Sequence, residues 1–148
     1  MTPARRRERG ASLPETAIVM TVLLGVLFGI IEFGRAMYTY AFVAQLAREG
    51  ARWAIVRGSQ CTLLDHCNAA STDVQTYVRS LSEGATNPNN IIVTATWPPG
   101  GCPPGATGNS PGCLVSVNVS YTFNFLGAKL IPVTSIPMSS TSQMIISQ

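Results

Sequence analysis

The sequence predicts an α+β protein in which one long N-terminal helix packs its second half on a small antiparallel sheet. Two observations carry this expectation. No proline interrupts residues 16–60, and beyond residue 90 the spacing of apolar residues changes from a helical period to a period of two. We therefore divide the chain into a leader (1–10), an N-terminal helix (11–57) and a head (58–148).

The helix is expected over residues 13–57, where Gly58 and Ser59 supply a stop. At ~1.5 Å per residue it would be on the order of 65 Å long, which is more than a head of this size can bury. Its first half is apolar on all sides, and its second half is mixed. We place a membrane span at about 13–35 and expect the second half to be the spine of the head.

Positive charge is confined to the beginning of the chain. The net charge is +3, and residues 1–10, with four arginines and one glutamate, supply all of it. A basic patch on a folded surface would indicate nucleic-acid binding, whereas a short basic tail before an apolar run indicates a cytoplasmic N-terminus. We therefore expect an inner-membrane protein with its head outside the cytoplasm, and no nucleic acid as partner.

The head is expected to hold one short helix and three strands. The helix is placed at 72–83, with Thr72 and Gln75 as a capping box and Gly84 as its end. Alternation is strongest after residue 114, where apolar side chains share one face and polar ones the other. The apolar set is Ile91, Val93, Ala95, Trp97, Val115, Val117, Val119, Tyr121, Phe123 and Phe125. A weaker strand is expected at 138–147, after a proline-containing connection at 127–137.

The sequence has four cysteines: Cys61, Cys67, Cys102 and Cys113. All of them follow the span and are therefore expected outside the cytoplasm, where disulfides persist. Four cysteines allow three pairings, and the sequence does not choose between them. Pairing Cys61 with Cys67 and Cys102 with Cys113 is favoured because each pair brackets a loop-like stretch. A zinc site is disfavoured because the spacing around His66 is not C-x-x-C. We expect no metal and no cofactor.

Catalytic motifs are absent from the sequence: it has no G-x-S-x-G, no H-E-x-x-H and no phosphate loop, and it has a single histidine. The chain is therefore expected to be a substrate of an enzyme, with no small-molecule substrate of its own.

The most specific motif is Gly10-Ala-Ser-Leu-Pro-Glu15, between the arginine cluster and the apolar run. It resembles the processing site of type IV pilins and pseudopilins. The resemblance implies that a prepilin peptidase cuts between Gly10 and Ala11 and leaves Glu15 as the fifth mature residue. In lipid, an unpaired carboxylate costs a few kcal/mol, which a neighbouring subunit's α-amino group would offset. Ser12 and Glu15 also form a capping box, and the two roles are compatible.

Two further stretches, Phe28-Gly-Ile-Ile-Glu-Phe-Gly-Arg35 and Ala47-Arg-Glu-Gly-Ala-Arg52, resemble the TadE-like proteins. The resemblance covers about residues 10–52. It implies a minor pilin or pseudopilin of a tight-adherence (Tad, or Flp) pilus or secretion system, with the major pilin and other minor pilins as partners. The head carries no motif of that family.

Within the span, Thr21, Gly25 and Gly29 lie four residues apart, a small-residue pattern that lets membrane helices approach closely. Glu32 lies about 25 Å beyond Glu15 along a helix, near the apolar thickness of a bilayer. Glu32 therefore marks the outer boundary of the span or makes a contact between subunits, and Arg35, three residues further on, can pair with Glu32 or reach the lipid headgroups. The competing hypothesis is a signal-anchored binding module that is neither cleaved nor assembled. A cleavable secretory signal is less favoured, because no A-x-A-like site precedes Glu32.

Overall fold

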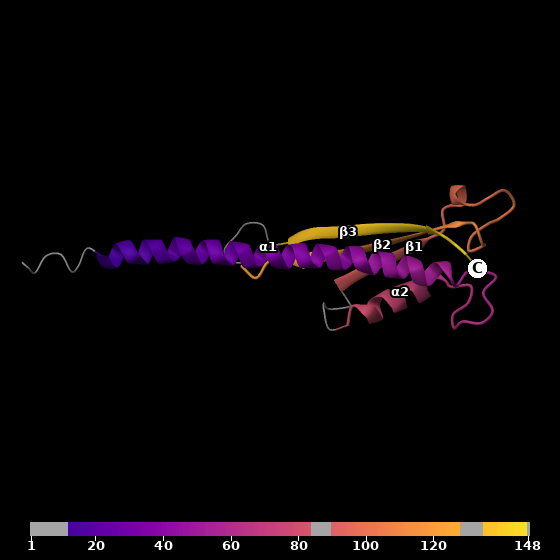
Figure 1. Cartoon of the computed structure of the whole chain (residues 1–148), viewed down its shortest axis with the longest axis horizontal. Coiled ribbons are helices and arrows are strands. Elements are labelled where there is room, and N and C mark those ends of the chain that lie inside the picture. The colour runs from indigo at the N-terminus through magenta and orange to yellow at the C-terminus, as the bar shows by residue number, and fades with distance from the viewer. Residues whose placement is uncertain (1–11, 84–89, 128–134, 148) are drawn as a thin grey trace, which may run out of the picture. The chain divides into compact units, whose positions relative to one another are not determined.

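The computed structural model describes residues 12–83, 90–127 and 135–147. Its main element is α1, a helix of 44 residues over Ser12–Ile55, which ends two residues before the predicted end. Contacts divide the chain into two units, Met1–Met37 and Tyr38–Gln148, and α1 begins in the first unit and ends in the second. Together with the sheet described below, this helix confirms the predicted α+β class (Figure 1).

The sheet is a three-stranded antiparallel meander in the order β1-β2-β3. Its strands are β1 (Ile91–Thr96), β2 (Leu114–Asn124) and β3 (Ser135–Ile145). Val119 of β2 stands opposite Val93 on one side and Ser140 on the other. The predicted alternation is confirmed, because Val115, Val117 and Val119 are fully buried.

The core of the second unit lies between this sheet and the end of α1. The helix contributes Val43, Leu46, Ala47, Ala51 and Ala54, which fall at positions i, i+3, i+4, i+8 and i+11 and therefore share one face. Gly50 lies at the closest approach: a Cβ there would be 2.7 Å from Val78 Cγ2 and 3.2 Å from Val117 Cγ1. The absence of a side chain at this position therefore lets α1 pack directly on the rest of the core.

The short helix α2 spans Ser71–Leu81, so the predicted start at Thr72 and the predicted cap are wrong. The N-cap is Ala70, whose N–H donates to Asp73 Oδ2 at 2.9 Å. The Asp73 carboxylate accepts this hydrogen bond from the backbone at the start of the helix. The sequence pattern predicted Gln75 in that role. Val74 and Val78 are fully buried, whereas Leu81, at the end of the helix, is 41% exposed. The helix ends at Leu81, so the predicted end at residue 83 is also wrong, since Ser82 and Glu83 form a turn; the predicted stop, Gly84, lies outside the described residues.

The ends of all three strands differ from prediction: β1 ends at Thr96, before Trp97, and β3 ends at Ile145, two residues before the predicted end. Strand β2 ends at Asn124, before Phe125, which instead packs edge-on against Phe123 with ring centroids 5.2 Å apart. Strand β3 begins at Ser135 and includes Pro137, which the sequence placed in a connection. An edge strand tolerates proline because an N–H that faces away from the sheet is not needed in the ladder.

Candidate functional site: the N-terminal helix and its head

The processing motif is only partly visible. Gly10, Ala11 and the side chain of Ser12 lie outside the described residues. Glu15 is exposed in the first turn of α1, where an acidic side chain is favoured by the positive end of the helix dipole. The Glu15 side chain is therefore accessible at the N-terminal end of α1, close in sequence to the predicted cleavage site.

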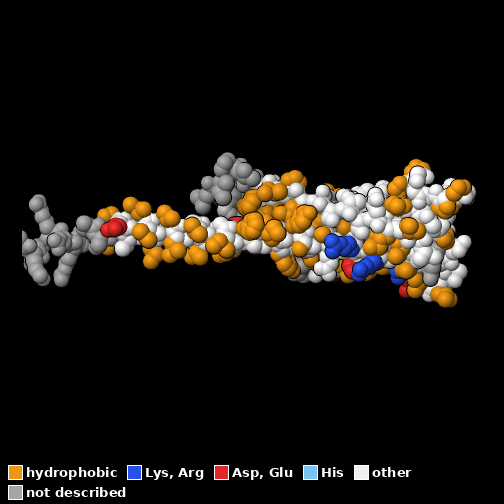
Figure 2. Space-filling model, turned by 45° about the horizontal axis from the view of Figure 1, so that its top comes forward, with side chains coloured by type: hydrophobic (Ala, Val, Ile, Leu, Met, Phe, Trp, Pro, Cys, Tyr) orange, Lys and Arg blue, Asp and Glu red, His pale blue; other side chains and the backbone are white. Residues whose placement is uncertain are grey.

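The first unit presents an apolar helix surface. Within the described residues, α1 is the one helix long and apolar enough to cross a membrane, with a mean hydropathy of 2.3 and none of that window buried. Leu13, Ile18, Phe28 and Phe33 are between 63% and 71% exposed. Figure 2 shows hydrophobic side chains along this part of the helix. Exposing this much apolar surface to water is unfavourable, so we expect lipid or another protein to cover it.

The small residues of the span leave open space. A Cβ added at Gly25 or Gly29 would have no heavy atom within 4 Å. The hydroxyl of Thr21 donates to the Ala17 carbonyl at 2.8 Å, so its polar group is satisfied within the helix. This face therefore offers room for the close approach of a second helix.

Glu32 and Arg35 form an ion pair along the helix. Arg35 Nη1 lies 2.9 Å from Glu32 Oε2, and the side chain of Glu32 is 14% exposed against 41% for Arg35. Pairing at this spacing reduces the cost of placing either charge at the end of an apolar stretch. The structure thus brings together these two predicted residues, whereas Glu15 stands apart near the start of α1.

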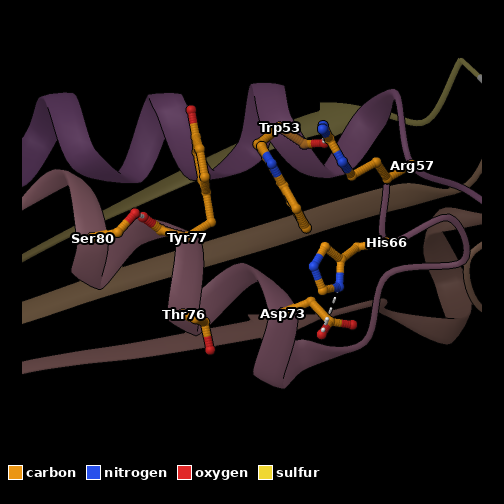
Figure 3. Close-up of a pocket in the computed structure, with 7 residues that line it drawn as sticks. All are labelled: Trp53, Arg57, His66, Asp73, Thr76, Tyr77 and Ser80. Carbon is orange, nitrogen blue, oxygen red and sulfur yellow. Dashed lines mark hydrogen bonds and ion pairs between the residues drawn. The ribbon is translucent and has the colours of Figure 1, made fainter. Parts of the chain in front are cut away.

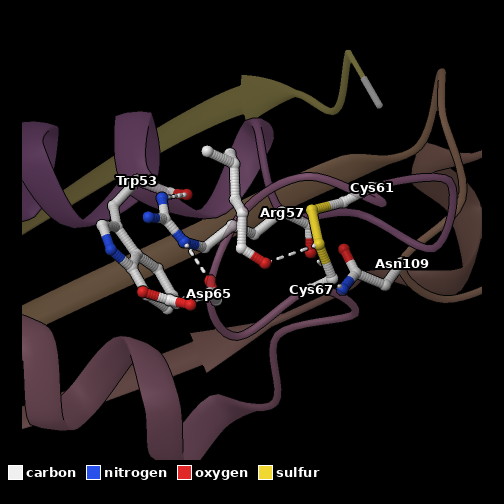
Figure 4. Close-up of a disulfide and its surroundings, with 7 residues drawn as sticks. Trp53, Arg57, Cys61, Asp65, Cys67 and Asn109 are labelled. Atoms are coloured by element: carbon white, nitrogen blue, oxygen red, sulfur yellow. Dashed lines mark hydrogen bonds between the residues drawn. A yellow bond between two sulfur atoms is a disulfide. The ribbon is translucent and has the colours of Figure 1, made fainter.

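In the head, the structure joins Cys61 to Cys67 and Cys102 to Cys113, the local pairing that the sequence favoured. Figure 4 shows the first of these bridges beside Arg57, whose guanidinium Nε donates to the Asp65 carbonyl at 2.9 Å. Arg57 also lies over the Trp53 ring, 4.2 Å from its centroid. Arg57, two residues beyond the end of α1, therefore contacts both this loop and a ring of the helix.

Asn109 connects the two disulfide loops, although no sequence pattern marks it as important. Its amide nitrogen donates to the carbonyls of Ala69 and Arg57 at 3.0 and 3.3 Å. Its amide oxygen accepts from Trp97 Nε1 at 3.1 Å. An asparagine in a loop rich in glycine and proline predicts only a turn. The hydrogen-bond partners of Asn109 could therefore be identified only from the tertiary structure.

A shallow pocket of about 250 Å³ lies where α1, α2 and the first disulfide loop meet (Figure 3). Trp53 and Tyr77 stack in it with centroids 5.1 Å apart, and His66 Nδ1 lies 3.5 Å from Asp73 Oδ1. Arg57 lies over Trp53, so the indole ring is enclosed by its own neighbours. In the part of the chain that the structure describes, no three His, Cys, Asp or Glu residues gather as metal ligands.

These features define a class: an α+β protein with a long N-terminal helix that is apolar enough to cross a membrane and that ends in the core of a small disulfide-containing head. The family comparison narrows this class. Residues 10–52 match the model of the TadE-like proteins, so the predicted resemblance is confirmed over the N-terminal third of the chain. The comparisons with curated proteins and with solved structures gave no match.

Proposed function

We propose that the chain is a minor pilin or pseudopilin of a Tad pilus or secretion system, cut by a prepilin peptidase between Gly10 and Ala11. One observation carries the proposal: the family match begins at Gly10 and continues through the apolar half of α1. The matched segment is therefore the one that would be processed, anchored and assembled.

The direction of insertion follows from charge. The arginines of residues 1–10 stay in the cytoplasm, and the apolar part of α1 crosses the inner membrane. The head then folds in an oxidising compartment, where bridges such as Cys61–Cys67 and Cys102–Cys113 persist.

Glu15 would couple cleavage to assembly. Cleavage after Gly10 creates a new α-amino group at Ala11, and an amino group of this kind on a neighbouring subunit can neutralise the Glu15 carboxylate in lipid. An unpaired carboxylate there costs a few kcal/mol, so insertion beside a processed partner is favoured over isolation. The open face at Gly25 and Gly29 leaves space for the partner's helix.

The role is structural rather than catalytic in this proposal. The pocket in the head combines one histidine, which is 64% exposed, with Asp73. Trp53 and Tyr77 stack on each other and Arg57 lies over Trp53, which stabilises the junction of α1 and α2. The pocket is therefore explained by packing.

The test is a host that carries the Tad genes but lacks this one. We expect loss or reduction of surface pili, restoration by the full chain, and the mature chain in sheared filaments or in a membrane complex with the major pilin. A signal-anchored binding module predicts normal pili in the deletion host and an uncleaved protein that co-purifies with no pilin. That second result would overturn the proposal.

A further inference from the structure

Strand β3 is the longer of the two edge strands of the sheet, and it carries no charge. It pairs with β2 over all of its 11 residues without a bulge. The other edge strand, β1, has 6 residues and packs against α2, where Gln75 Nε2 donates to the Val93 carbonyl at 3.4 Å (Figure 1). Proteins usually protect an edge strand with charges, a bulge, proline or a covering element. In the part of the chain that the structure describes, the one such device on β3 is Pro137.

Every second residue of β3 directs its backbone N–H and C=O away from β2. In an antiparallel ladder, consecutive residues present these groups to opposite sides. Ile146, which follows the strand, donates its N–H to the carbonyl of Cys113, the residue before β2. By alternation, the even-numbered residues of β3 bond to β2 and the odd-numbered residues point outward, which agrees with the position of Pro137. The outward residues at the centre of the strand are Ser139, Thr141 and Gln143, and no other described strand pairs with them on that side.

The core-facing side of β3 is covered less completely than that of the other two strands. Val93 of β1 and Val119 of β2 face the core and are at most 4% exposed. In β3, four successive residues on the same face are only half-buried: Met138, Ser140, Ser142 and Met144. The two serines are small, so apolar side chains on a strand beside β3 would cover the methionines and extend the core.

We propose that the edge of β3 binds an extended, uncharged segment of another polypeptide as a fourth strand. The outward N–H and C=O groups alternate along the edge with a spacing that another strand matches. A helix has already bonded its own backbone groups, and lipid tails offer none. The half-buried methionines favour apolar side chains at every second position of the segment. A charge at those positions would lose water without gaining a partner, because β3 has no charged residue.

A second copy of β3 fits this edge less well. Antiparallel pairing of two β3 strands about Thr141 would place Pro137 opposite Ile145 at both ends, where the missing N–H leaves a carbonyl without a donor. It would also place Ser140 beside Ser142, so no large apolar side chain would cover the core-facing side. The proposed occupant is therefore a segment of different sequence. This inference requires neither the membrane anchor nor cleavage, so its test is independent of the proposed function.

The test is amide hydrogen exchange, followed by NMR, in the full chain purified in detergent micelles with its disulfides intact. In the protein alone, we expect the outward N–H groups of Ser139, Thr141 and Gln143 to exchange faster than those of Ser140 and Ser142, which bond to β2. The probe is an end-blocked peptide with the sequence of residues 114–124, which is uncharged, alternates in polarity and pairs with β3 in the fold. Adding this peptide should slow exchange at the three outward positions by about tenfold or more.

Two comparisons identify backbone pairing as the cause of this protection. Thr141→Pro removes an outward N–H but no bond to β2, and should weaken binding of the labelled peptide by about tenfold or more, whereas Thr141→Ala keeps the N–H and should stay within about twofold of the parent. With the unchanged protein, a fully N-methylated peptide has no N–H to donate and should give no protection.

Three results would overturn the proposal. The first is no protection at a saturating concentration of the unmodified peptide, or equal protection by its N-methylated form. The second is protection of the outward N–H groups without peptide that rises with protein concentration, which would make a second copy the occupant. The third is loss of protection at Ser140 and Ser142 when peptide is added, which would mean that the peptide replaces β2 and does not add a strand.

Discussion

The side-chain amide of Asn109 donates to the Ala69 carbonyl at 3.0 Å, and so links the loop closed by Cys102–Cys113 to the segment that follows Cys61–Cys67. The same amide reaches the Arg57 carbonyl just beyond α1, and the Asn109 carbonyl accepts from the Ser59 N–H at 2.8 Å. Asn109 thus connects both loops and the end of the long helix, which makes it a structural centre of the head.

Replacement of Asn109 by alanine is expected to destabilise the head by about 1–3 kcal/mol. The change leaves the Trp97 N–H and the Ala69 carbonyl without their partner in a half-buried place, whereas the Arg57 carbonyl keeps its hydrogen bond from the Ala69 N–H. Urea unfolding followed by tryptophan fluorescence measures this, since Trp53 and Trp97 both lie near the loops. Asn124→Ala, exposed at the end of β2, is the control and should stay within about 0.5 kcal/mol of the parent. Equal effects of the two substitutions would contradict the role given to Asn109.

Gly50→Ala is expected to destabilise the head by about 1–3 kcal/mol, even though alanine favours helix more than glycine does. The added methyl would meet Val78 Cγ2 at 2.7 Å, and Val78 is fully buried and stiff at χ1. The same unfolding experiment applies. Gly100→Ala provides the comparison, because a Cβ there has nothing within 4 Å and should change little. A more stable Gly50→Ala variant would show that α1 does not pack this closely.

The local disulfide pairing makes a prediction for unreduced tryptic digests. Trypsin cuts after Arg57, Arg79 and Lys129, so Cys61 and Cys67 fall in one peptide and Cys102 and Cys113 in the next. The account predicts two separate peptides, 58–79 and 80–129, each of which gains two hydrogens on reduction. Either crossed pairing would join the two peptides into one product, which mass spectrometry distinguishes directly.

Local periodicity predicted most of the fold. The alternation from Val115 to Phe123 identified the buried face of β2, and the absence of proline after Thr16 identified α1. Contacts between distant segments were not predictable in this way. Gly50 was unremarkable in sequence because its importance comes from Val78 and Val117, which fold against it. Pro137 was predicted in a connection but lies in β3. A strand tolerates proline at the edge of a sheet, and local periodicity does not reveal which strand is at the edge.

Only part of the candidate site can be compared with prediction, because Gly10 and Ala11 lie outside the described residues. Helical spacing allowed Arg35 either to pair with Glu32 or to reach the lipid headgroups, and the structure shows the pair at 2.9 Å. The α2 cap was missed because Thr72 and Gln75 match the capping pattern as well as Asp73 does, and only the fold decides between them. The head carries no motif that identifies a ligand, and which residues of the three strands lie side by side became known only from the strand register.

Glu15→Ala and the isosteric Glu15→Gln are expected to leave cleavage intact and to reduce pilus assembly or incorporation of the chain. Both remove the carboxylate that would pair with a partner's α-amino group. Thr16→Ala, on the same turn, should assemble normally. If Glu15→Gln assembles as well as the parent, the carboxylate acts only as a helix cap or in the helix dipole, and the coupling of cleavage to assembly is wrong.

The central claim is that this chain is processed as a pilin-like subunit, and the mass and sequence of its mature N-terminus test it most directly. Expressed in full with its peptidase, the protein is predicted to begin at Ala11, and Gly10→Ala or removal of the peptidase should leave the leader attached. A chain that still begins at Met1 or Thr2 in the presence of the active peptidase would contradict the account.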